Sequence, residues 1–342
     1  MKKKVLFLFA HLHKGGMQRA VSNITQALGD EYEFHVAYFG TENPGYKYNA
    51  MMHDFKIPGS LNDNFFLKIK KYFNKLSVLR NFVNKNRIDK VISFGESANL
   101  LNLLSKHNSK KILSVRVAIN EGLGTGIYAN ISKILINIFY KQADLIIPVS
   151  KKLAEDCRKI VGKKVPICHI PNMYPIDEIR RKSEEELPKE FKYLENENYI
   201  INVGSLCYQK GQDLLIKAYS KLDDIKDNYK LVLVGRGPDK DKLVNLTNEL
   251  GLKDRVIFID FQNNPYPFIK HAEIFVLSSR YEGFPNVLIE AMICGTPVVS
   301  FDCPTGPNEI IDNEVDGILV SSIDETKLSY SIQNLVVIRK IS

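Results

Sequence analysis

Two glutamates eight residues apart stand out in the segment Ser279–Met292. Glu282 precedes a predicted helix that begins at Pro285 and ends before Gly295, because proline suits the first turn of a helix and glycine suits its end. Glu290 lies inside that helix among Leu, Ile, Ala and Met residues, so we expect its carboxylate in a mostly apolar setting. A buried carboxylate needs a hydrogen-bonding partner, and the hydroxyl groups of a ligand would supply one.

A lysine and two pairs of turn residues have the chemistry that suits a phosphate group. Lys210 follows Gly204 and Ser205 at the start of a predicted helix, where the helix dipole disfavours a cation unless an anion is bound there. A solvated lysine is the alternative. Gly15 and Gly16 let the backbone approach a ligand, and the helix that follows directs free N–H groups towards it. A tight turn without a ligand is the alternative for this pair.

A third turn contains Gly235, Arg236 and Gly237 and continues into an Asp-Lys-Asp sequence at residues 239–241. This sequence resembles the metal-binding D-x-D of some enzymes, but acidic residues are also common caps at a helix start. We favour the capping role and expect no metal. Neither this turn nor the first one forms a G-x-G-x-x-G fingerprint, which argues against a dinucleotide site.

Short apolar segments that alternate with helical segments must position these residues. The predicted strands of the first half are Val5–Ala10, Phe34–Phe39, Val91–Phe94, Ile112–Arg116, Leu145–Val149 and Val165–Ile170. Those of the second half are Tyr199–Val203, Lys230–Val234, Val256–Ile259, Ile274–Leu277, Val298–Ser300 and Ile318–Val320. Such alternation predicts parallel sheets that are covered by helices on both faces.

The alternation is interrupted once, by a polar segment. We therefore predict an α/β protein with two doubly wound, Rossmann-like domains, residues 1–172 and 199–342, joined by a linker at 173–198. In open α/β sheets, ligands lie at the carboxyl ends of the strands, so two facing domains imply a site in the cleft between them.

The composition is that of a globular protein. The chain has 342 residues, of which 44% are hydrophobic and 25% charged, and this length fits two domains. No apolar run approaches the roughly 18 residues of a membrane span, and the start of the chain reads as a buried strand, not a signal peptide. The five cysteines form no C-x-x-C pair, which disfavours a disulfide framework or a zinc site and favours the reducing cytoplasm.

The charge is unevenly distributed along the chain. Residues 1–172 hold 27 Lys and Arg against 12 Asp and Glu, a net charge of +15, whereas residues 173–342 have a net charge of −7. The basic half therefore predicts an anionic partner, either a nucleic acid or a membrane surface.

Together these features resemble the retaining GT-B glycosyltransferases of family 4. The resemblance is carried by the two doubly wound domains, the Gly15-Gly16 turn and Lys210. It is most specific in the sequence from Glu282 to Ala291, in the following Gly-Thr-Pro-Val-Val, and in the Gly-Pro-Asn-Glu that begins at Gly306. It covers essentially the whole chain.

The resemblance implies a GT-B fold and a reaction that moves a sugar from a nucleotide donor to an acceptor hydroxyl with retained anomeric configuration. It implies neither a metal nor a cofactor. Glu282 and the backbone of residues 283–286 would hold the donor sugar, Glu290 the ribose and Lys210 the leaving diphosphate. The predicted donor-binding residues are Gly15, Gly16, Gly204, Ser205, Lys210, Arg236, Glu282, Gly283, Phe284, Pro285, Asn286 and Glu290.

Three features depart from the family pattern. Ser205 stands where relatives usually have an arginine, so one cation for the diphosphate is missing. Arg116 stands where many relatives have a histidine near the reacting carbons, and our hypothesis is that Arg116 replaces the lost charge. We group it with Glu282 and Lys210 as a predicted catalytic residue. The chain stops at Ser342, so we expect the C-terminal helices that cross back onto the first domain to be missing.

Residues 64–86 form a predicted helix within a basic segment, residues 64–90. The segment holds one acid and eight basic residues, namely Lys68, Lys70, Lys71, Lys75, Arg80, Lys85, Arg87 and Lys90. Apolar residues recur near helical spacing, and this pattern is typical of a membrane-surface helix. If half of its charges face anionic lipid at about 1 kcal/mol each, binding is worth about 3–4 kcal/mol. A helix that packs on the sheet with solvated lysines is the alternative, and both can hold at once. No nucleic-acid motif is present, so we expect no nucleic-acid partner.

We therefore predict a cytoplasmic glycosyltransferase, peripherally associated with the inner face of the cell membrane. Its donor would be a nucleotide sugar, a UDP-sugar, and its acceptor a lipid-linked saccharide in the synthesis of a bacterial surface polysaccharide or glycan. The alternatives are a GT-B sugar-nucleotide epimerase or phosphorylase, and a catalytically weak scaffold that keeps the fold. Because the fingerprint glycines are missing, an NAD-dependent oxidoreductase is disfavoured.

Overall fold

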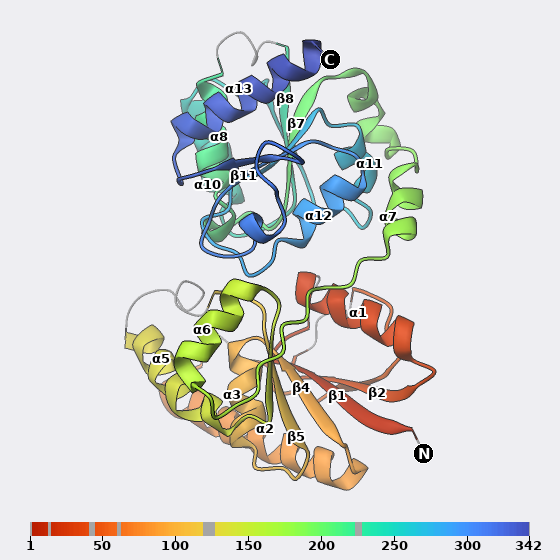
Figure 1. Ribbon diagram of the computed structural model, residues 1–342, viewed down its shortest axis with the longest axis vertical. Helices are drawn as coiled ribbons and strands as arrows, with labels where there is room; N and C mark the ends of the chain where they lie inside the picture. The colour runs from red at the N-terminus through yellow and green to blue at the C-terminus, as the bar shows by residue number, and fades with distance from the viewer. Residues whose placement is uncertain are drawn as a thin grey trace. The chain divides into compact units, whose positions relative to one another are not determined.

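The computed structural model describes residues 2–12, 15–40, 45–59, 63–118, 127–222 and 228–341. The chain divides into two compact units, Met1–Tyr174 and Pro175–Ser342, and each contains one six-stranded parallel sheet (Figure 1). The predicted pair of doubly wound α/β domains is therefore confirmed. None of the described helices has the length and apolarity that crossing a membrane requires.

The sheet of the first unit has the strand order β3-β2-β1-β4-β5-β6. Its strands are β1 (Lys3–Phe9), β2 (Tyr32–Tyr38), β3 (Met51–Asp54), β4 (Lys90–Phe94), β5 (Lys110–Val115) and β6 (Leu145–Pro148). From β1 the chain adds β2 and then β3 on one side. It then crosses back, and β4 pairs with β1 on the other side. The point where the strand order reverses thus lies between β1 and β4.

Helices cover both faces of this sheet. They are α1 (Gly16–Leu28), α2 (Phe65–Asn86), α3 (Glu96–Leu104), α5 (Ile127–Phe139) and α6 (Lys151–Val161), with the 3-10 turn η1 (Tyr140–Gln142). Alternate side chains of β1 point to opposite faces, so Phe7 packs in a cluster with Val21 of α1, and Leu8 packs in another with Leu79 of α2. Helix α3 lies on the same face as α2, because Leu101 belongs to the second cluster (Figure 1).

The sheet of the second unit has the order β12-β11-β10-β7-β8-β9, which repeats the topology of the first. Its strands are β7 (Tyr199–Val203), β8 (Lys230–Val234), β9 (Val256–Ile259), β10 (Ile274–Leu277), β11 (Val298–Phe301) and β12 (Ile318–Val320). Here the order reverses between β7 and β10, which pair directly.

Helices flank this sheet as well. They are α7 (Ile176–Ser183), α8 (Gln212–Ser220), α10 (Lys240–Glu249), α11 (Tyr266–Lys270), α12 (Asn286–Ile293) and α13 (Glu325–Ile341), with the 3-10 turns η2 (Lys189–Asn196), η3 (Tyr208–Lys210) and η4 (Pro307–Glu309). Residues of α8, α10 and α13 form one cluster with the strands, and Figure 1 shows α11 and α12 on the other side of the sheet. Helix α13 packs against α8 of the same unit.

The strands of the first unit differ from the prediction in two places. The predicted strand Val165–Ile170 forms a single bridge between Ile167 and Ile146 of β6. Pro166 lies in this segment and lacks the N–H that a regular ladder requires. Conversely, β3 was not predicted, because its Met-Met-His-Asp sequence has no β-branched residues, although it pairs with β2 at the edge of the sheet.

The segment predicted as a linker, residues 173–198, contains α7 and η2. Helix α7 packs against α11 and α12, and Leu194 of η2 is fully buried. Some charges of this segment pair locally, as in the ion pair of 2.6 Å between Lys182 Nζ and Glu178 Oε1, and Glu184 pairs with Lys270 of α11. The structure therefore assigns most of the predicted linker to the second unit, whose boundary lies between Tyr174 and Pro175.

Candidate active site

Lys210 and Glu282 lie at the carboxyl edge of the second sheet, where the strand order reverses. Lys210 ends η3, which follows β7, and Glu282 belongs to the loop that follows β10. Strands β7 and β10 are neighbours, so the loops that follow them are neighbours too. Ligands of open α/β sheets bind at this reversal, which makes these two loops the candidate site of the second unit.

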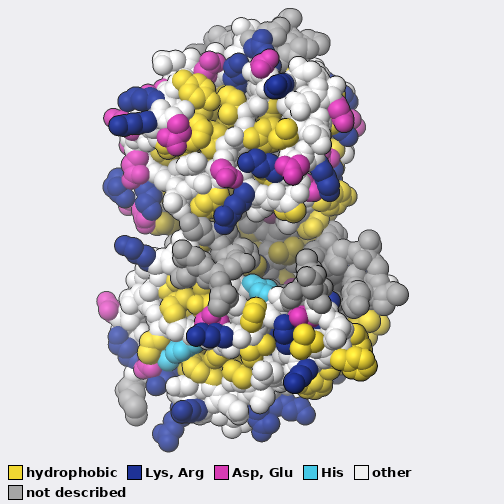
Figure 2. Space-filling model, turned by 180° about the vertical axis from the view of Figure 1, so that it is seen from behind, with side chains coloured by type: hydrophobic (Ala, Val, Ile, Leu, Met, Phe, Trp, Pro, Cys, Tyr) yellow, Lys and Arg dark blue, Asp and Glu magenta, His cyan; other side chains and the backbone are white. Residues whose placement is uncertain are grey.

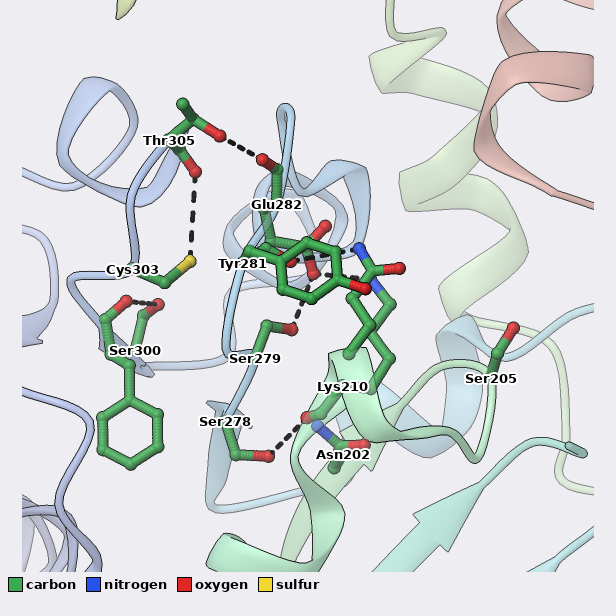
Figure 3. Close-up of polar contacts among 12 residues, drawn as sticks. Asn202, Ser205, Lys210, Ser278, Ser279, Tyr281, Glu282, Ser300, Cys303 and Thr305 are labelled. Carbon is green, nitrogen blue, oxygen red and sulfur yellow. Dashed lines mark hydrogen bonds and ion pairs between the residues drawn. The ribbon is translucent and has the colours of Figure 1, made fainter. Parts of the chain in front are cut away.

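The two side chains form a short ion pair. Lys210 Nζ donates to Glu282 Oε1 at 2.5 Å, and Ser279 Oγ donates to the same oxygen at 2.6 Å. Figure 3 shows the side chains of Lys210 and Ser279 directed at Glu282. The exposed fraction is 22% for the lysine side chain and 7% for the glutamate, so the carboxylate is buried and the ammonium group faces partly outwards. Glu282 thus fixes the position of a cation at the mouth of the site.

Further hydrogen bonds join the loop of Lys210 to the loop of Glu282. Ser278 Oγ donates to the carbonyl oxygen of Lys210 at 3.0 Å (Figure 3). Gln209 Nε2 donates to the carbonyl oxygen of Tyr281, also at 3.0 Å. The hydroxyl group of Thr305 donates to the carbonyl oxygen of Glu282. Because these bonds use the backbone of both loops, the cation and the carboxylate are held in one rigid arrangement.

An ion pair that the sequence did not indicate supports the same loops. Arg280 donates two hydrogen bonds to the carboxylate of Asp213 in α8, at 2.8 and 2.7 Å. Burial alone would raise the pKa of Asp213, but the hydrogen bonds from Arg280 outweigh it and hold this pKa below its usual value. The guanidinium also lies 4.2 Å from the ring centroid of Tyr208. Arg280 therefore fastens the loop after β10 to the helix that follows Lys210.

Two glycines allow the backbones of the site to approach closely. Gly211 has φ +63°, and a Cβ there would lie 2.1 Å from the carbonyl oxygen of Ser278. Gly235 has φ +151°, and a Cβ there would lie 1.9 Å from the carbonyl oxygen of Gly204. Because both contacts are with backbone atoms, neither position accepts another residue without moving a loop.

The second glutamate of the pair lies where the sequence predicted it. Glu290 is buried inside α12, which begins at Asn286, with Pro285 as the residue before it. Gly283 and Pro285 are also buried, and Phe284 is partly buried. The structure thus places the predicted sugar-binding segment between Glu282 and α12. The roles in binding the sugar and the ribose remain predictions.

The remaining predicted residues of the second unit line neighbouring loops. Leu206 N donates to the carbonyl oxygen of Arg236 at 3.0 Å, which brings the loop after β8 beside the loop after β7. Ser205 and Arg236 are both exposed. Asp239 precedes α10 and pairs with Lys242 Nζ at 3.0 Å. No group of three or more metal-ligating side chains occurs among the described residues, and the expectation of metal independence stays a prediction.

The first unit contributes its own predicted residues at the carboxyl edge of its sheet. Gly15 precedes α1 in an extended conformation, and Gly16 is the first residue of that helix. Arg116 follows β5 directly, and its Nε donates to Ser114 Oγ at 2.7 Å. Gly15 and Gly16 follow β1, which adjoins the reversal of strand order in this sheet, so the turn lies where ligands bind in open sheets.

Glu96 is a candidate that the sequence analysis missed. It begins α3 directly after β4, on the other side of the reversal. Burial raises the pKa of Glu96 to about 7, although hydrogen bonds from Tyr140 and Asn99 act in the opposite direction. Nothing in the local sequence signals this environment, because the hydrogen-bond donor Tyr140 lies 44 residues further along the chain.

Two family models cover nearly the whole chain. The model described as Glycosyltransferase Family 4 matches residues 14–178, and the model described as Glycosyl transferases group 1 matches residues 183–340. The chain belongs to the group 1, family 4 glycosyltransferases. Both units are thus parts of one glycosyltransferase, and the candidate site lies in the group 1 unit.

Individual glycosyltransferases resemble the chain over most of its length. An uncharacterized glycosyltransferase of Methanocaldococcus jannaschii is 37% identical over 72% of this chain, and the match spans 63% of that protein's own length. A relative from Campylobacter jejuni is 29% identical over 98% of this chain and 90% of its own. It bears the name N-acetylgalactosamine-N,N'-diacetylbacillosaminyl-diphospho-undecaprenol 4-alpha-N-acetylgalactosaminyltransferase.

Solved structures share the fold of this glycosyltransferase. HepE of Anabaena, crystallised with UDP and glucose, superposes with a TM-score of 0.79 at 18% identity, covering 98% of this chain and 90% of its own. Sucrose-phosphate synthase of Thermosynechococcus elongatus superposes with a TM-score of 0.78 at 19% identity, with the same two coverages. The predicted family and the predicted GT-B fold are both confirmed.

Proposed function

We propose that this glycosyltransferase moves a sugar from a UDP-sugar to a saccharide carried on a lipid diphosphate, with retained anomeric configuration. The observation that carries the proposal is the cation of Lys210, held by Glu282 at the reversal point of the second sheet. The names of the relatives support both substrates: the Campylobacter jejuni relative is named for a diphospho-undecaprenol acceptor, and HepE was crystallised with UDP.

Lys210 would stabilise the charge that develops on the leaving diphosphate. The ammonium group has three N–H donors, and the ion pair with Glu282 uses one of them. Two donors therefore remain for phosphate oxygens, on the side of the lysine that is not buried. Because Glu282 and the backbone fix the lysine before the reaction, little reorganisation is needed as the charge develops.

The two glutamates would hold the sugar and the ribose, which lie on either side of the diphosphate of the donor. Glu282 and the backbone from Gly283 to Asn286 form one segment beside Lys210, which suits the sugar next to the diphosphate. Glu290 is buried inside α12, where its carboxylate would accept hydrogen bonds from the ribose hydroxyl groups. The donor would then extend along the carboxyl edge of the second sheet.

Binding of the donor nucleotide provides the first test. We expect UDP to raise the melting temperature, with smaller shifts for GDP, ADP and NAD, because a ligand that binds only the native state adds about 2.7 kcal/mol at one hundred times its Kd. Glu290→Gln should lose most of the shift, and Glu249→Gln, on the exposed face of α10, should keep it. The measurement is a thermal melt at several nucleotide concentrations.

Transfer itself is tested with a short-chain prenyl-diphosphate saccharide and a panel of UDP-sugars, with the anomeric configuration of the product read by NMR. A cooperatively melting chain that responds to no nucleotide and forms no product would contradict the proposal and favour an inactive scaffold. An inverted product would contradict the retaining mechanism alone.

A lipid-linked acceptor requires access to a membrane, and we propose that α2 supplies it. The first half of α2 exposes aromatic side chains, with exposed fractions of 64% for Phe65, 81% for Phe66 and 66% for Phe73. The second half packs on the sheet through Leu79 and Val83. The exposed first half of α2 therefore supports a membrane-surface helix, and its buried second half supports a helix that packs on the sheet.

Basic and apolar side chains also lie together near this helix. Lys68 and Lys70 are exposed between the aromatic residues of α2. Helix α5 packs on α3, as α2 does, and exposes Ile134 and Ile138. Figure 2 shows hydrophobic and basic side chains side by side on a face of the first unit. An apolar surface with a basic margin is the chemistry that an anionic lipid surface recognises.

Vesicle sedimentation tests this surface. We expect the chain to sediment with anionic vesicles and less with zwitterionic ones. The double variant Lys68→Gln/Lys70→Gln should bind roughly thirtyfold more weakly, because each charge near the surface is worth about 1 kcal/mol. Phe66→Ser should also weaken binding, whereas Val315→Ser, which removes an exposed apolar residue of the second unit, should not. Equal binding of all four proteins would rule out α2 as the contact.

A further inference from the structure

Arg116 is held in one orientation by two hydrogen bonds and a ring contact. Its Nε donates to Ser114 Oγ at 2.7 Å, and its Nη1 donates to Asn172 Oδ1. The guanidinium carbon lies 5.0 Å from the ring centroid of Phe94, the last residue of β4. The contacts come from β4, β5 and the end of the first unit, so the side chain is fixed by elements that are far apart in the sequence.

None of these neighbours compensates the charge of Arg116. Within the described ranges, its hydrogen-bond and ring partners are all neutral, and no carboxylate forms an ion pair with it. Burial lowers the pKa of Arg116 to about 10, although Tyr174 nearby acts in the opposite direction, so the guanidinium remains a cation at neutral pH. A cation–π contact offsets only part of the cost of desolvating a charge. A desolvated cation with only neutral partners is therefore expected to bind an anion.

The position of Arg116 favours a ligand as the source of that anion. The residue directly follows β5 at the carboxyl edge of the first sheet, where ligands of open α/β sheets bind. Two of its five N–H donors are used in the hydrogen bonds to Ser114 and Asn172, which leaves a planar set of donors suited to a phosphate group. As a whole residue Arg116 is partly exposed, although its guanidinium lies among protein atoms that lower its pKa.

We propose that Arg116 binds a phosphate group of a substrate and that Ser114 and Asn172 orient it for this contact. The proposal rests on the proposed function for the identity of the substrate. Either substrate supplies the same chemistry, because the UDP-sugar and the lipid-linked saccharide both carry a diphosphate. The two sources are separated by measuring each ligand in the absence of the other.

The donor arm measures the Kd of UDP by calorimetry without acceptor. If Arg116 contacts the donor diphosphate, Arg116→Gln should raise this Kd by about 10- to 100-fold, the usual effect of a charge-assisted hydrogen bond. Arg116→Lys keeps the charge but loses the planar fork, so its effect should be smaller, about threefold to tenfold. The matched control is Arg158→Gln in α6, which removes the same charge and two hydrogen bonds to backbone carbonyls and should leave the Kd unchanged.

The acceptor arm measures KM at saturating donor for a prenyl-diphosphate saccharide and for an alkyl glycoside of the same saccharide. If Arg116 contacts the acceptor diphosphate, Arg116→Gln should raise the first KM by about 10- to 100-fold and leave the second unchanged. A residue that only supports the fold would affect both acceptors equally. The comparison therefore distinguishes a phosphate contact from a structural role.

Binding of inorganic pyrophosphate separates this proposal from the proposed function. One outcome is that the wild-type chain transfers no sugar but binds pyrophosphate, and that Arg116→Gln weakens this binding. The phosphate site is then supported and the proposed reaction is refuted. The phosphate site is refuted if folded Arg116→Gln keeps its UDP Kd, its pyrophosphate Kd and its KM for the prenyl-diphosphate acceptor within twofold of wild type. If Arg116→Gln does not melt cooperatively, the same comparisons with Arg116→Lys decide the outcome.

Discussion

Lys210→Ala is expected to lower the turnover number by about a hundred- to thousandfold, equivalent to about 3–4 kcal/mol of transition-state stabilisation. The physical reason is that the leaving diphosphate gains charge in the transition state, and this lysine is a preorganised cation beside it. The measurement is kcat at saturating UDP-sugar and acceptor. Lys217→Ala, on the exposed side of α8, is the control and should keep full turnover. Near-full turnover in Lys210→Ala would remove Lys210 from the mechanism.

The same substitution should also reduce stability, because it leaves the buried carboxylate of Glu282 without its cation. Lys210 is partly exposed, so we expect a loss of about 2–3 kcal/mol in the free energy of unfolding, below the range for fully buried pairs. The double variant Lys210→Ala/Glu282→Gln removes the uncompensated charge and should regain most of the stability but none of the activity. Urea denaturation measures the first effect and kcat the second. Parallel recovery of both would mean that Lys210 acts through stability alone.

The fold could be predicted because it depends on short-range patterns. The buried parallel strands are apolar along their whole length, so β7, β8, β9 and β10 were predicted with the observed boundaries. The strand β3 was missed, since only its pairing with β2 makes its four residues a strand. The polar composition of residues 173–198 predicted a linker, and the structure has α7 and η2 within this segment. A few buried residues of this polar segment, such as Leu194, could not be recognised from composition alone.

The sequence predicted individual residues of the site but not which of their side chains contact one another. Lys210 and Glu282 were both identified, yet their ion pair spans 72 residues and depends on the neighbouring positions of β7 and β10. The pair of Arg280 and Asp213 was missed because each residue is ordinary in its own segment. The order of the strands around the reversal point, and not any local motif, brings these four side chains together.

The basic helix shows a similar limit. The periodicity of residues 64–86 predicted α2 with an error of one residue at its start. It did not reveal which of the apolar residues face the sheet. The structure buries Leu79 and Val83 in a cluster with the strands and leaves Phe65 and Phe66 exposed. An exposed aromatic surface of this kind needs tertiary structure to be recognised.

Gly211→Ala is expected to be among the most damaging single substitutions in the second unit. The new Cβ would lie 2.1 Å from the carbonyl oxygen of Ser278, and φ of +63° is unfavourable for any residue with a side chain. We expect a loss of about 2–5 kcal/mol in the free energy of unfolding, from backbone strain together with overpacking. Because Ser278 belongs to the loop that carries Glu282, the displaced loop should also lower kcat by about tenfold or more.

Gly251→Ala is the matched control for this prediction. Gly251 has nearly the same backbone conformation, with φ +69°, but a Cβ there would meet no atom within 4 Å. It should therefore show the conformational cost alone, about 1 kcal/mol, with no change in kcat. Denaturant unfolding and steady-state kinetics of the two variants, measured side by side, separate the strain from the contact. If both variants lose the same stability and both keep kcat, the close approach of Gly211 to Ser278 does not hold the site together. If only Gly211→Ala loses activity, the glycine after Lys210 is as necessary to the site as the charged residues, because it sets the distance between their two loops.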